Sequence, residues 1–578
     1  METFQSILAT KLSNALAGAG FPDAGELTPA SDPRFGDYQT NAALVLGKQR
    51  GENPRTLAEK ILAQLDVGDL CEPPTVAGVG FINFLLRADA VAKKAEEVLR
   101  HERFGVAEAK SLRRIVIDFG SPNVAKPMHV GHIRSMVLGD ALARIAQFLG
   151  HEVIRDNHIG DWGTQFGMVI YGWKNLLNRE ALQRDPLAEI VRIYKETNER
   201  ATRDPQVREA CRQELVKLQA GDKENLDIWN ECVALSMQDF DHVYQLLDIR
   251  YDIQCGESFY NDRLAGVVEH LLEAGIAEVS EGAVVVFFRD IPELIDKPLI
   301  ICKRDGGFNY ATTDLATVDY RVNDLKADAI WYVVGAPQIL HFKQIFEVAR
   351  REGYAPDLRH ITFGSILGED RKLMKTRSGE NVPLRGVLEE ACKRARKIIE
   401  EKNPDLSEAD KIDIARTIGI GAIKYFDLSQ YRMTDYIFSW DRMLSLQGNT
   451  APYLQNAYVR IRSIFRKAGE TWRRHPADED IGWKPMPLVL TDPVEIHLAK
   501  RLCQFAEIVP QVLNDFRPNI LANYLFELAN SFHTFYEACP VLKSEAPARS
   551  SRLALCDLTG RILQRGLDLL GIKAPEKM

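Results

Sequence analysis

Short apolar runs alternate with helical patterns through the middle of the chain. Six runs have the length of a buried strand, and they stand at Ile115–Phe119, Glu152–Arg155, Ala283–Phe288, Leu299–Lys303, Ile330–Val334 and Ile361–Phe363. The helical pattern after the first run is the clearest, because one helix face is marked every four residues by Ile133, Val137, Ala141, Ile145 and Leu149. Such alternation predicts an α/β fold with a doubly wound, Rossmann-like parallel sheet.

The regions on either side of this pattern predict further domains. Residues 1–105 carry helical patterns at both ends and are expected to form a separate N-terminal α+β domain. The α/β domain is expected at 112–387, interrupted by a charged helical insertion at about 174–255. Helical patterns then dominate. They predict a connecting segment at 388–445 and an all-α domain at 446–578, with a loop inside that domain at Arg474–Pro493.

Length and composition fit a multidomain globular protein. The chain of 578 residues is too long for one hydrophobic core, and its 46% hydrophobic content is ample for several. No stretch approaches the apolar length of a membrane span, and residues 1–20 lack the basic start and apolar run of a signal peptide. The nine cysteines never occur in C-x-x-C spacing, which favours reduced thiols in a cytoplasm and argues against a structural zinc site.

The segment Ser121–His132 carries the strongest candidate chemistry. It follows the first apolar run and precedes the clearest helical pattern, so His129 and His132 lie at a strand-to-helix turn with Gly131 just before the second histidine. Unpaired N–H groups and the helix dipole favour phosphate at such a turn, imidazoles can donate to phosphate oxygens, and glycine permits close approach. The spacing alone leaves open two capping or metal-binding histidines.

This segment reads Ser-Pro-Asn-Val-Ala-Lys-Pro-Met-His-Val-Gly-His. It resembles the HIGH signature of class I aminoacyl-tRNA synthetases, and closely that of the arginyl-tRNA synthetases. The resemblance implies ATP-dependent ligation of L-arginine to tRNA(Arg) through an arginyl-adenylate, with Mg²⁺ carried on ATP and no metal site on the protein. It also implies transfer to the terminal 2′-hydroxyl of the tRNA, and a need for bound tRNA even in the first step.

A second basic element, Gly368–Gly379, follows the last apolar run. A charged loop is often simply solvated, but class I synthetases carry a KMSKS loop at this place. The aligned residues here are Leu373-Met-Lys-Thr-Arg377, so lysine is missing from the first and fourth positions. Lys126, just before the histidines, is expected to replace the missing charge; the alternative is that it extends into solvent.

These two elements give the expected catalytic and ATP-binding residues. The resemblance implies catalytic roles for Lys126, His129, His132, Lys375 and Arg377. It implies ATP contacts from His129, Gly131, His132, Met374 and Lys375.

Two acids are candidates for binding the guanidinium of arginine, a planar cation with five donors that carboxylates meet best. They are Glu257 and Asp314, and Tyr310 stands four residues before Asp314, so on a helix the two would share one face. The strings around both acids resemble the arginine-binding elements of the family. The family further implies that Asn123 and Gln338 hold the backbone of the amino acid. For each acid alone, an exposed surface charge is the alternative.

Candidates for RNA binding lie near both ends of the chain. The strings at 35–41 and 78–84 resemble the additional N-terminal domain of the family, which reads the D-loop of tRNA. The resemblance implies that Phe81 stacks on a base and Asn83 reads a base edge. A place for Phe81 in the core and for Asn83 in a turn is the alternative.

The C-terminal helical region resembles the anticodon-binding domain of the family. A helix-like signature at 439–453 precedes a basic run, and Tyr453, Tyr458 and Arg460 are the expected tRNA contacts. A solvated helix face is the alternative. The formal net charge of −8 argues against gross non-specific binding of nucleic acid and leaves room for local basic surfaces of this kind.

The resemblance covers essentially the whole chain and predicts a monomeric, cytoplasmic, arginine-specific synthetase. Three alternatives remain. A synthetase of another specificity would lack the paired acids. A small nucleotidyltransferase shares the His-x-Gly-His spacing but is far shorter, and a catalytically inactive RNA-binding relative would not need intact histidines and acids.

Overall fold

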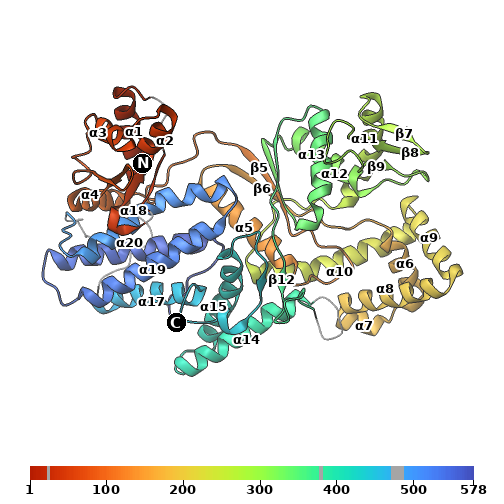
Figure 1. The fold of residues 1–578 in the computed structure, drawn as a ribbon. Helices are drawn as coiled ribbons and strands as arrows, with labels where there is room; N and C mark the ends of the chain where they lie inside the picture. Colours follow the sequence, from red (N-terminus) through yellow and green to blue (C-terminus); the bar gives the residue numbers. More distant parts are fainter. Residues whose placement is uncertain (22–25, 31, 376–381, 470–486) are drawn as a thin grey trace. The chain divides into compact units, whose positions relative to one another are not determined.

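The computed structural model describes residues 1–21, 26–30, 32–375, 382–469 and 487–578 (Figure 1). The chain divides into two compact units. The first comprises 1–108, 445–569 and 573–578, and the second comprises 109–444 and 570–572. No helix in the described part of the chain is long and apolar enough to cross a membrane.

A four-stranded parallel sheet lies at the centre of the second unit. Its order is β11-β10-β5-β6, and its strands are β5 (Arg114–Phe119), β6 (Glu152–Asp156), β10 (Ala329–Val333) and β11 (Asp357–His360). Helix α5 (His132–Phe148) leads from β5 to β6 on one side, and α13 (Ile339–Arg351) leads from β10 to β11 on the other. The chain therefore changes direction between β5 and β10, where open α/β sheets bind ligands at the carboxyl ends of the strands.

Helix α5 packs closely on the centre of this sheet (Figure 1). A Cβ on Gly139 would lie 2.3 Å from Cγ of Phe119, so only glycine allows this approach of helix to strand. The Ser135 hydroxyl accepts from the N–H of Gly120 at 2.8 Å and donates to the carbonyl of Val333 at 2.6 Å. One side chain thus ties the first turn of α5 to the ends of both β5 and β10.

Two of the predicted strands belong to a different sheet. A three-stranded antiparallel sheet is formed by β7 (Glu278–Ser280), β8 (Ala283–Val286) and β9 (Leu299–Cys302). The prediction that Ala283–Phe288 and Leu299–Lys303 join the parallel sheet is therefore wrong. The reason is local, since Glu281 and Gly282 adopt φ of 51° and 84° and close a two-residue hairpin.

The last strand of the parallel sheet precedes the predicted run Ile361–Phe363. The strand β11 ends at His360, and only the N–H of Ile361 continues the ladder, donating to the carbonyl of Tyr332 at 2.8 Å. Ile361 is buried, as its apolar character requires, but as part of the segment that leaves the sheet. The apolar character of this run therefore predicted that Ile361 is buried, but it did not predict where the strand ends.

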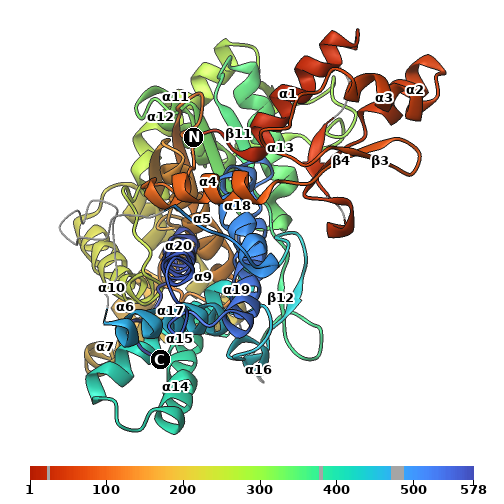
Figure 2. The same cartoon turned by 90° about the vertical axis from the view of Figure 1, so that its left-hand side faces the viewer.

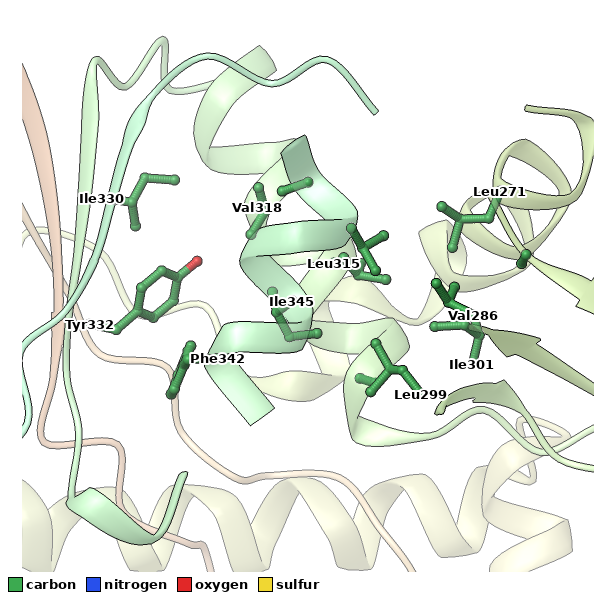
Figure 3. Close-up of a cluster of buried hydrophobic side chains, with 14 of the residues drawn as sticks. Leu271, Val286, Leu299, Ile301, Leu315, Val318, Ile330, Tyr332, Phe342 and Ile345 are labelled. Atoms are coloured by element: carbon green, nitrogen blue, oxygen red, sulfur yellow. The ribbon is translucent and has the colours of Figure 1, made fainter. Parts of the chain in front are cut away.

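Side chains from both sheets meet in one core with α12 (Tyr310–Asn323) and α13 (Figure 3). Leu315 and Val318 project from α12, and Figure 3 shows them between Ile330 on β10 and Ile301 on β9. Each fully buried aliphatic side chain contributes roughly 1.5–3 kcal/mol. This packing fixes the rotation of α12 about its axis, and with it the direction of the face that carries Asp314.

The insertion after β6 is helical, as predicted. Its helices are α6 (Gln165–Leu176), α7 (Arg179–Arg184), α8 (Pro186–Arg203), α9 (Pro205–Gln219) and α10 (Lys223–Leu247). Helices α7 to α10 each begin with a short polar side chain that accepts a hydrogen bond from a backbone N–H of the first turn. These side chains belong to Asn178, Asp185, Asp204 and Asp222. Proline begins α8 and α9, which suits the first turn because its missing N–H would have no partner there.

After the parallel sheet the chain forms a helix pair and a short second parallel pairing. Helices α14 (Leu384–Lys402) and α15 (Glu408–Leu428) pack together, and β12 (Ile366–Leu367) pairs with β13 (Tyr436–Ile437). The stretch 439–453, expected to be one helical signature, is instead split. Helix α16 (Trp440–Met443) ends early, and the next helix, α17 (Ala451–Ala468), starts eight residues later.

The first unit joins a small α+β domain to a helical bundle. The antiparallel sheet β1-β2-β4-β3 consists of Leu27–Pro29, Tyr38–Thr40, Phe81–Phe84 and Thr75–Ala77. Its helices are α1 (Phe4–Gly18), α2 (Ala42–Arg50), α3 (Pro54–Leu62) and α4 (Ala88–Arg100). The bundle consists of α17 (Ala451–Ala468), α18 (Pro493–Asn514), α19 (Pro518–Ala538) and α20 (Ala548–Leu569), and α4 packs along α18 (Figure 2).

A buried acid links the small domain to the bundle. Glu507 on α18 accepts from the hydroxyl of Tyr38 at 2.9 Å and from the N–H of Gln5 at 3.0 Å. Burial raises the pKa of Glu507. Beside it, Lys500 and Asp37 form an ion pair at 2.7 Å. Most of the predicted loop Arg474–Pro493 lies outside the described residues, and 487–492 contain no helix or strand.

Candidate functional site

The turn after β5 is strained and is held on both sides. Ser121 and Ala125 adopt φ of 45° and 61°, a backbone region that costs residues with a Cβ of order 1–3 kcal/mol each. The N–H of Val124 donates to the carbonyl of Gly160, and that of Val130 donates to the carbonyl of Val382, both at 3.0 Å. The fold thus maintains this conformation, which is characteristic of functional segments.

His129 and His132 form a pair at the N-terminus of α5. Their ring centroids are 4.1 Å apart. The N–H of Gly131 donates to Nδ1 of His129, and the N–H of His129 donates to Nδ1 of His132, each at 3.1 Å. A neutral ring whose Nδ1 accepts carries its proton on Nε2. The His129 ring therefore presents Nε2–H as a donor for a ligand. Nδ1 of His132 also lies 3.2 Å from the carbonyl oxygen of His129, a contact that suits the tautomer with the proton on Nδ1.

Burial keeps both histidines neutral. It lowers the pKa of His129, and it lowers that of His132 to about 4, with the neighbouring His129 as a further cause. Neutral imidazole N–H groups beside the positive end of a helix dipole can bind a polyphosphate through hydrogen bonds.

Lys126 and Asn123 lie on the same turn. Both are exposed, and Nζ of Lys126 is 5.9 Å from the ring centroid of Tyr194 on α8. A Cβ on Gly160 would lie 2.3 Å from Oδ1 of Asn123, so a glycine is required where the Asn123 side chain packs. The N–H of Gly160 in turn donates to the carbonyl of Pro122 at 3.0 Å.

The basic loop begins as a tight turn after β12. The N–H of Gly368 donates to the carbonyl of Lys372 at 2.8 Å, and that of Met374 donates to the carbonyl of Ile366 at 3.2 Å. Lys372 and Lys375 are exposed, and Met374 is half-buried. Arg377 and Gly379 lie outside the described residues.

Glu257 begins the short helix η2 (Glu257–Tyr260). Asp161 fixes this helix start by accepting from the N–H and the hydroxyl of Ser258, at 2.8 and 2.7 Å. Burial raises the pKa of Glu257 to about 7, the like charges of Asp314 and Asp161 contribute in the same direction, and His158 opposes them. Two acids are thus held within electrostatic reach of each other, an arrangement that a bound cation stabilises.

Asp314 lies on α12, one turn after Tyr310, so the predicted shared face is present. Its Oδ2 is 2.5 Å from Nε2 of His341 on α13, and the His341 ring lies 4.8 Å from that of Tyr310. Gln338 is exposed immediately before α13. The sequence analysis did not identify His341. Its position three residues after Gln338, a predicted site residue, could have indicated that it lies near the site.

Sequence reasoning also missed a buried ionic network beneath these acids. Arg321 on α12 is fully buried and lies 2.6 Å from Asp118 at the end of β5 and 2.7 Å from Asp156 at the end of β6. Asp118 also accepts from the hydroxyl of Ser121 at 2.9 Å. The network ties the acid-bearing helix to the strained turn.

The expected RNA contacts lie in the first unit and differ in exposure. Phe81 is half-buried, whereas Asn83 is buried in the sheet and Tyr458 is buried in the bundle. Tyr453 is half-buried and its hydroxyl donates to Asn530 at 2.6 Å.

Arg460 belongs to a half-exposed aromatic and basic cluster on α17 and α19. It donates to Nδ1 of His533 at 3.1 Å, and its guanidinium lies 5.6 Å from the ring centroid of Tyr536, which is 38% exposed. The ring of Tyr453 lies 5.1 Å from that of His533. Such a surface combines positive charge with stacking faces.

No group of three or more His, Cys, Asp and Glu side chains that could hold a metal ion occurs among the described residues. The nine cysteines are all free thiols.

Three family models match the chain. The model for the catalytic domain of class I tRNA synthetases (R) matches residues 94–440. The model for the DALR anticodon binding domain matches residues 454–578, and that for the arginyl tRNA synthetase N terminal domain matches residues 3–86.

Whole proteins give the same result. The arginine–tRNA ligase of Chromobacterium violaceum is 44% identical, with all of both chains covered. The crystal structure of arginyl-tRNA synthetase from Plasmodium falciparum is similar over all of both chains, with 29% identity and a TM-score of 0.85. The arginyl-tRNA synthetase of Thermus thermophilus gives 27% identity and a TM-score of 0.82, again over both full chains. The chain therefore belongs to the arginyl-tRNA synthetase family of class I aminoacyl-tRNA synthetases.

Proposed function

We propose that the protein ligates L-arginine to its cognate tRNA in two steps. The arginine carboxylate first attacks the α-phosphorus of ATP, which forms arginyl-adenylate and breaks the bond to pyrophosphate. A hydroxyl of the terminal tRNA adenosine then attacks the activated carbonyl and releases AMP. The observation that supports this proposal most strongly is that α5, which begins at the histidine pair, and α12, which carries Asp314, are both tied to the end of β5.

His129 and His132 serve the first step as electrostatic donors. The attacking carboxylate is already ionised, so no general base is needed, and catalysis consists of positioning and stabilising charge on the phosphates. The neutral His129 ring presents Nε2–H, the His132 ring lies beside it at the N-terminus of α5, and Gly131 gives the nucleotide close access. Lys126, Lys375 and Arg377 add charge, and Met374 contacts ATP.

Magnesium is proposed to arrive with ATP rather than on a protein site. An ion carried in this way would be held by the oxygens of the phosphates themselves. Bound there, it neutralises phosphate charge.

Glu257 and Asp314 are proposed to bind the guanidinium, with Tyr310 beside them and with Asn123 and Gln338 on the α-amino and carboxyl groups. The raised pKa of Glu257, about 7, supports this role, because the same burial and like charge that disfavour its ionisation are relieved by a bound cation. The exposure of Asn123 and Gln338 leaves both amides accessible to a ligand.

The first unit is proposed to bind tRNA. Residues 1–105 would contact the D-loop through Phe81, and 446–578 would contact the anticodon arm through Tyr453 and Arg460. The partly exposed cluster of Arg460, His533 and Tyr536 supports the second contact. Asn83 and Tyr458 are buried, and their expected contacts with tRNA stay predictions. We further propose that the protein acts as a monomer in the cytoplasm.

The test is aminoacylation of total tRNA with each labelled amino acid in turn. Arginine alone should be incorporated, and incorporation should require ATP. Charging with a different amino acid would indicate another specificity, and absence of charging with normal tRNA binding would indicate a catalytically inactive relative.

A further inference from the structure

Among the described residues the His341 side chain makes one hydrogen bond, and its partner is a proposed arginine-binding acid. Its Nε2 lies 2.5 Å from Oδ2 of Asp314, and the His341 side chain is 11% exposed. Because the carboxylate oxygen accepts, the proton of the bond lies on Nε2. Within the described residues Nδ1 is buried and has no hydrogen-bond partner.

The hydrogen bond to Asp314 explains why a polar ring occupies this buried position. Burying an imidazole removes two nitrogen atoms from water, and an apolar ring would fill the same space without that cost. The neighbouring contacts are aromatic, with ring centroids of Tyr310 and Phe342 at 4.8 and 5.5 Å. The one contact that needs an imidazole is therefore the one with Asp314.

We infer that His341 is a positioning residue that determines how Asp314 meets the substrate. Donation to Oδ2 stops rotation of the carboxylate and assigns the other oxygen, Oδ1, to the guanidinium. The ring of Tyr310 packs against the ring of His341. Residues of α12 and of the start of α13 thus hold the Asp314 carboxylate in one orientation. The inference rests on the proposed function, since it concerns the orientation of the arginine-binding acid.

Four variants separate this role from packing. His341→Leu removes both nitrogens, His341→Gln keeps an N–H donor near the place of Nε2, and His341→Asn keeps a polar group only near Nδ1. Lys343→Ala is the matched control, because Lys343 lies on the same helix and pairs at the surface with Glu293. Thermal unfolding of each variant reports on folding.

The readouts are the KM for arginine, the KM for ATP, kcat, and the inhibition constant of agmatine. Agmatine carries the guanidinium but lacks the carboxylate, so it reports on the guanidinium subsite without chemistry. His341→Leu should raise the arginine KM and the agmatine inhibition constant together by roughly tenfold, the scale for losing a hydrogen bond to a charged group. The ATP KM should stay within about twofold, and His341→Gln should recover most of the loss while His341→Asn should not.

Failure of the inference is distinct from failure of the proposed function. If the parent protein does not charge tRNA with arginine, the proposed function is wrong. If the parent does so, the positioning role is overturned by an unchanged arginine KM in His341→Leu, by a loss in kcat alone, or by equal behaviour of the Gln and Asn variants. If His341→Leu does not fold, the comparison of Gln with Asn decides alone.

Discussion

The nucleotide side and the arginine side of the candidate site are built in different ways. His129 and His132 lie on one turn, and backbone N–H groups fix both rings. Glu257, Asp314 and His341 come from three separate elements and are placed by side-chain contacts and by core packing. The contacts that fix the two histidine rings thus lie within one segment, whereas the arginine side exists only after the helices have packed on the sheets. Substitutions on the two sides should therefore affect different kinetic constants.

The largest effect is expected from the histidines. His129→Ala or His132→Ala should each lower the rate of adenylate formation by about two to three powers of ten, the scale for removing one donor to a transition state. The arginine KM should hardly change. Arginine-dependent exchange of pyrophosphate into ATP measures the step, and His270→Ala, at a histidine that is 58% exposed on the surface, is the control. Near-normal turnover of either variant would remove that residue from the nucleotide side.

Lys126→Ala should come next, with a loss in kcat of about a hundredfold. The charge acts on the transition state, so kcat should fall more than the ATP KM rises. Leu373→Lys in the same variant should recover part of the loss, because both ammonium groups would address the same phosphates. Steady-state kinetics at saturating tRNA measure both. A kcat within about twofold of the parent would mean that Lys126 extends into solvent, as its exposure permits.

Asp314→Asn should affect the arginine side of the site. It keeps the shape of the side chain and removes a charge-assisted pair, so the arginine KM should rise roughly thirtyfold while the ATP KM changes little. Asp319→Asn is the matched control, because Asp319 lies on the same helix and accepts from Tyr354 instead. Unchanged arginine KM would leave Glu257 as the principal acid.

The pH dependence of arginine binding should be the smallest effect. In the free protein the pKa of Glu257 is raised to about 7, so the acid is largely protonated below that pH and charged above it. A guanidinium binds the charged form, so binding releases a proton and the arginine KM should rise as pH falls below about 7, by at most about tenfold per unit. Glu257→Gln should abolish this slope. The same slope in parent and variant would assign the titration to another group.

Local sequence was sufficient to predict the strand, turn and helix that carry His129 and His132. The apolar run of β5, the glycine and histidines of the turn, and the periodicity of α5 are contiguous in the chain, and the structure has each element there. The shared face of Tyr310 and Asp314 was also predictable, because it depends only on helical spacing.

Non-local contacts could not be predicted in the same way. The antiparallel sheet of β7, β8 and β9 was mistaken for part of the parallel one, because a buried strand has the same apolar pattern in either sheet. His341 and Arg321 have no motif of their own, and their roles follow from partners 27 and 165 residues away, Asp314 and Asp156. Sequence indicated which residue types the arginine side needs, but packing decides which of them meet.

Equilibrium binding of arginine by calorimetry tests the division of the site most directly. Three proteins are compared without ATP but with bound tRNA: the parent, His132→Ala and Asp314→Asn. The two-sided account predicts that His132→Ala binds arginine within about twofold of the parent, and that Asp314→Asn binds it at least about tenfold more weakly. Equal weakening in both variants would contradict it, because the two sides would then form a single coupled site.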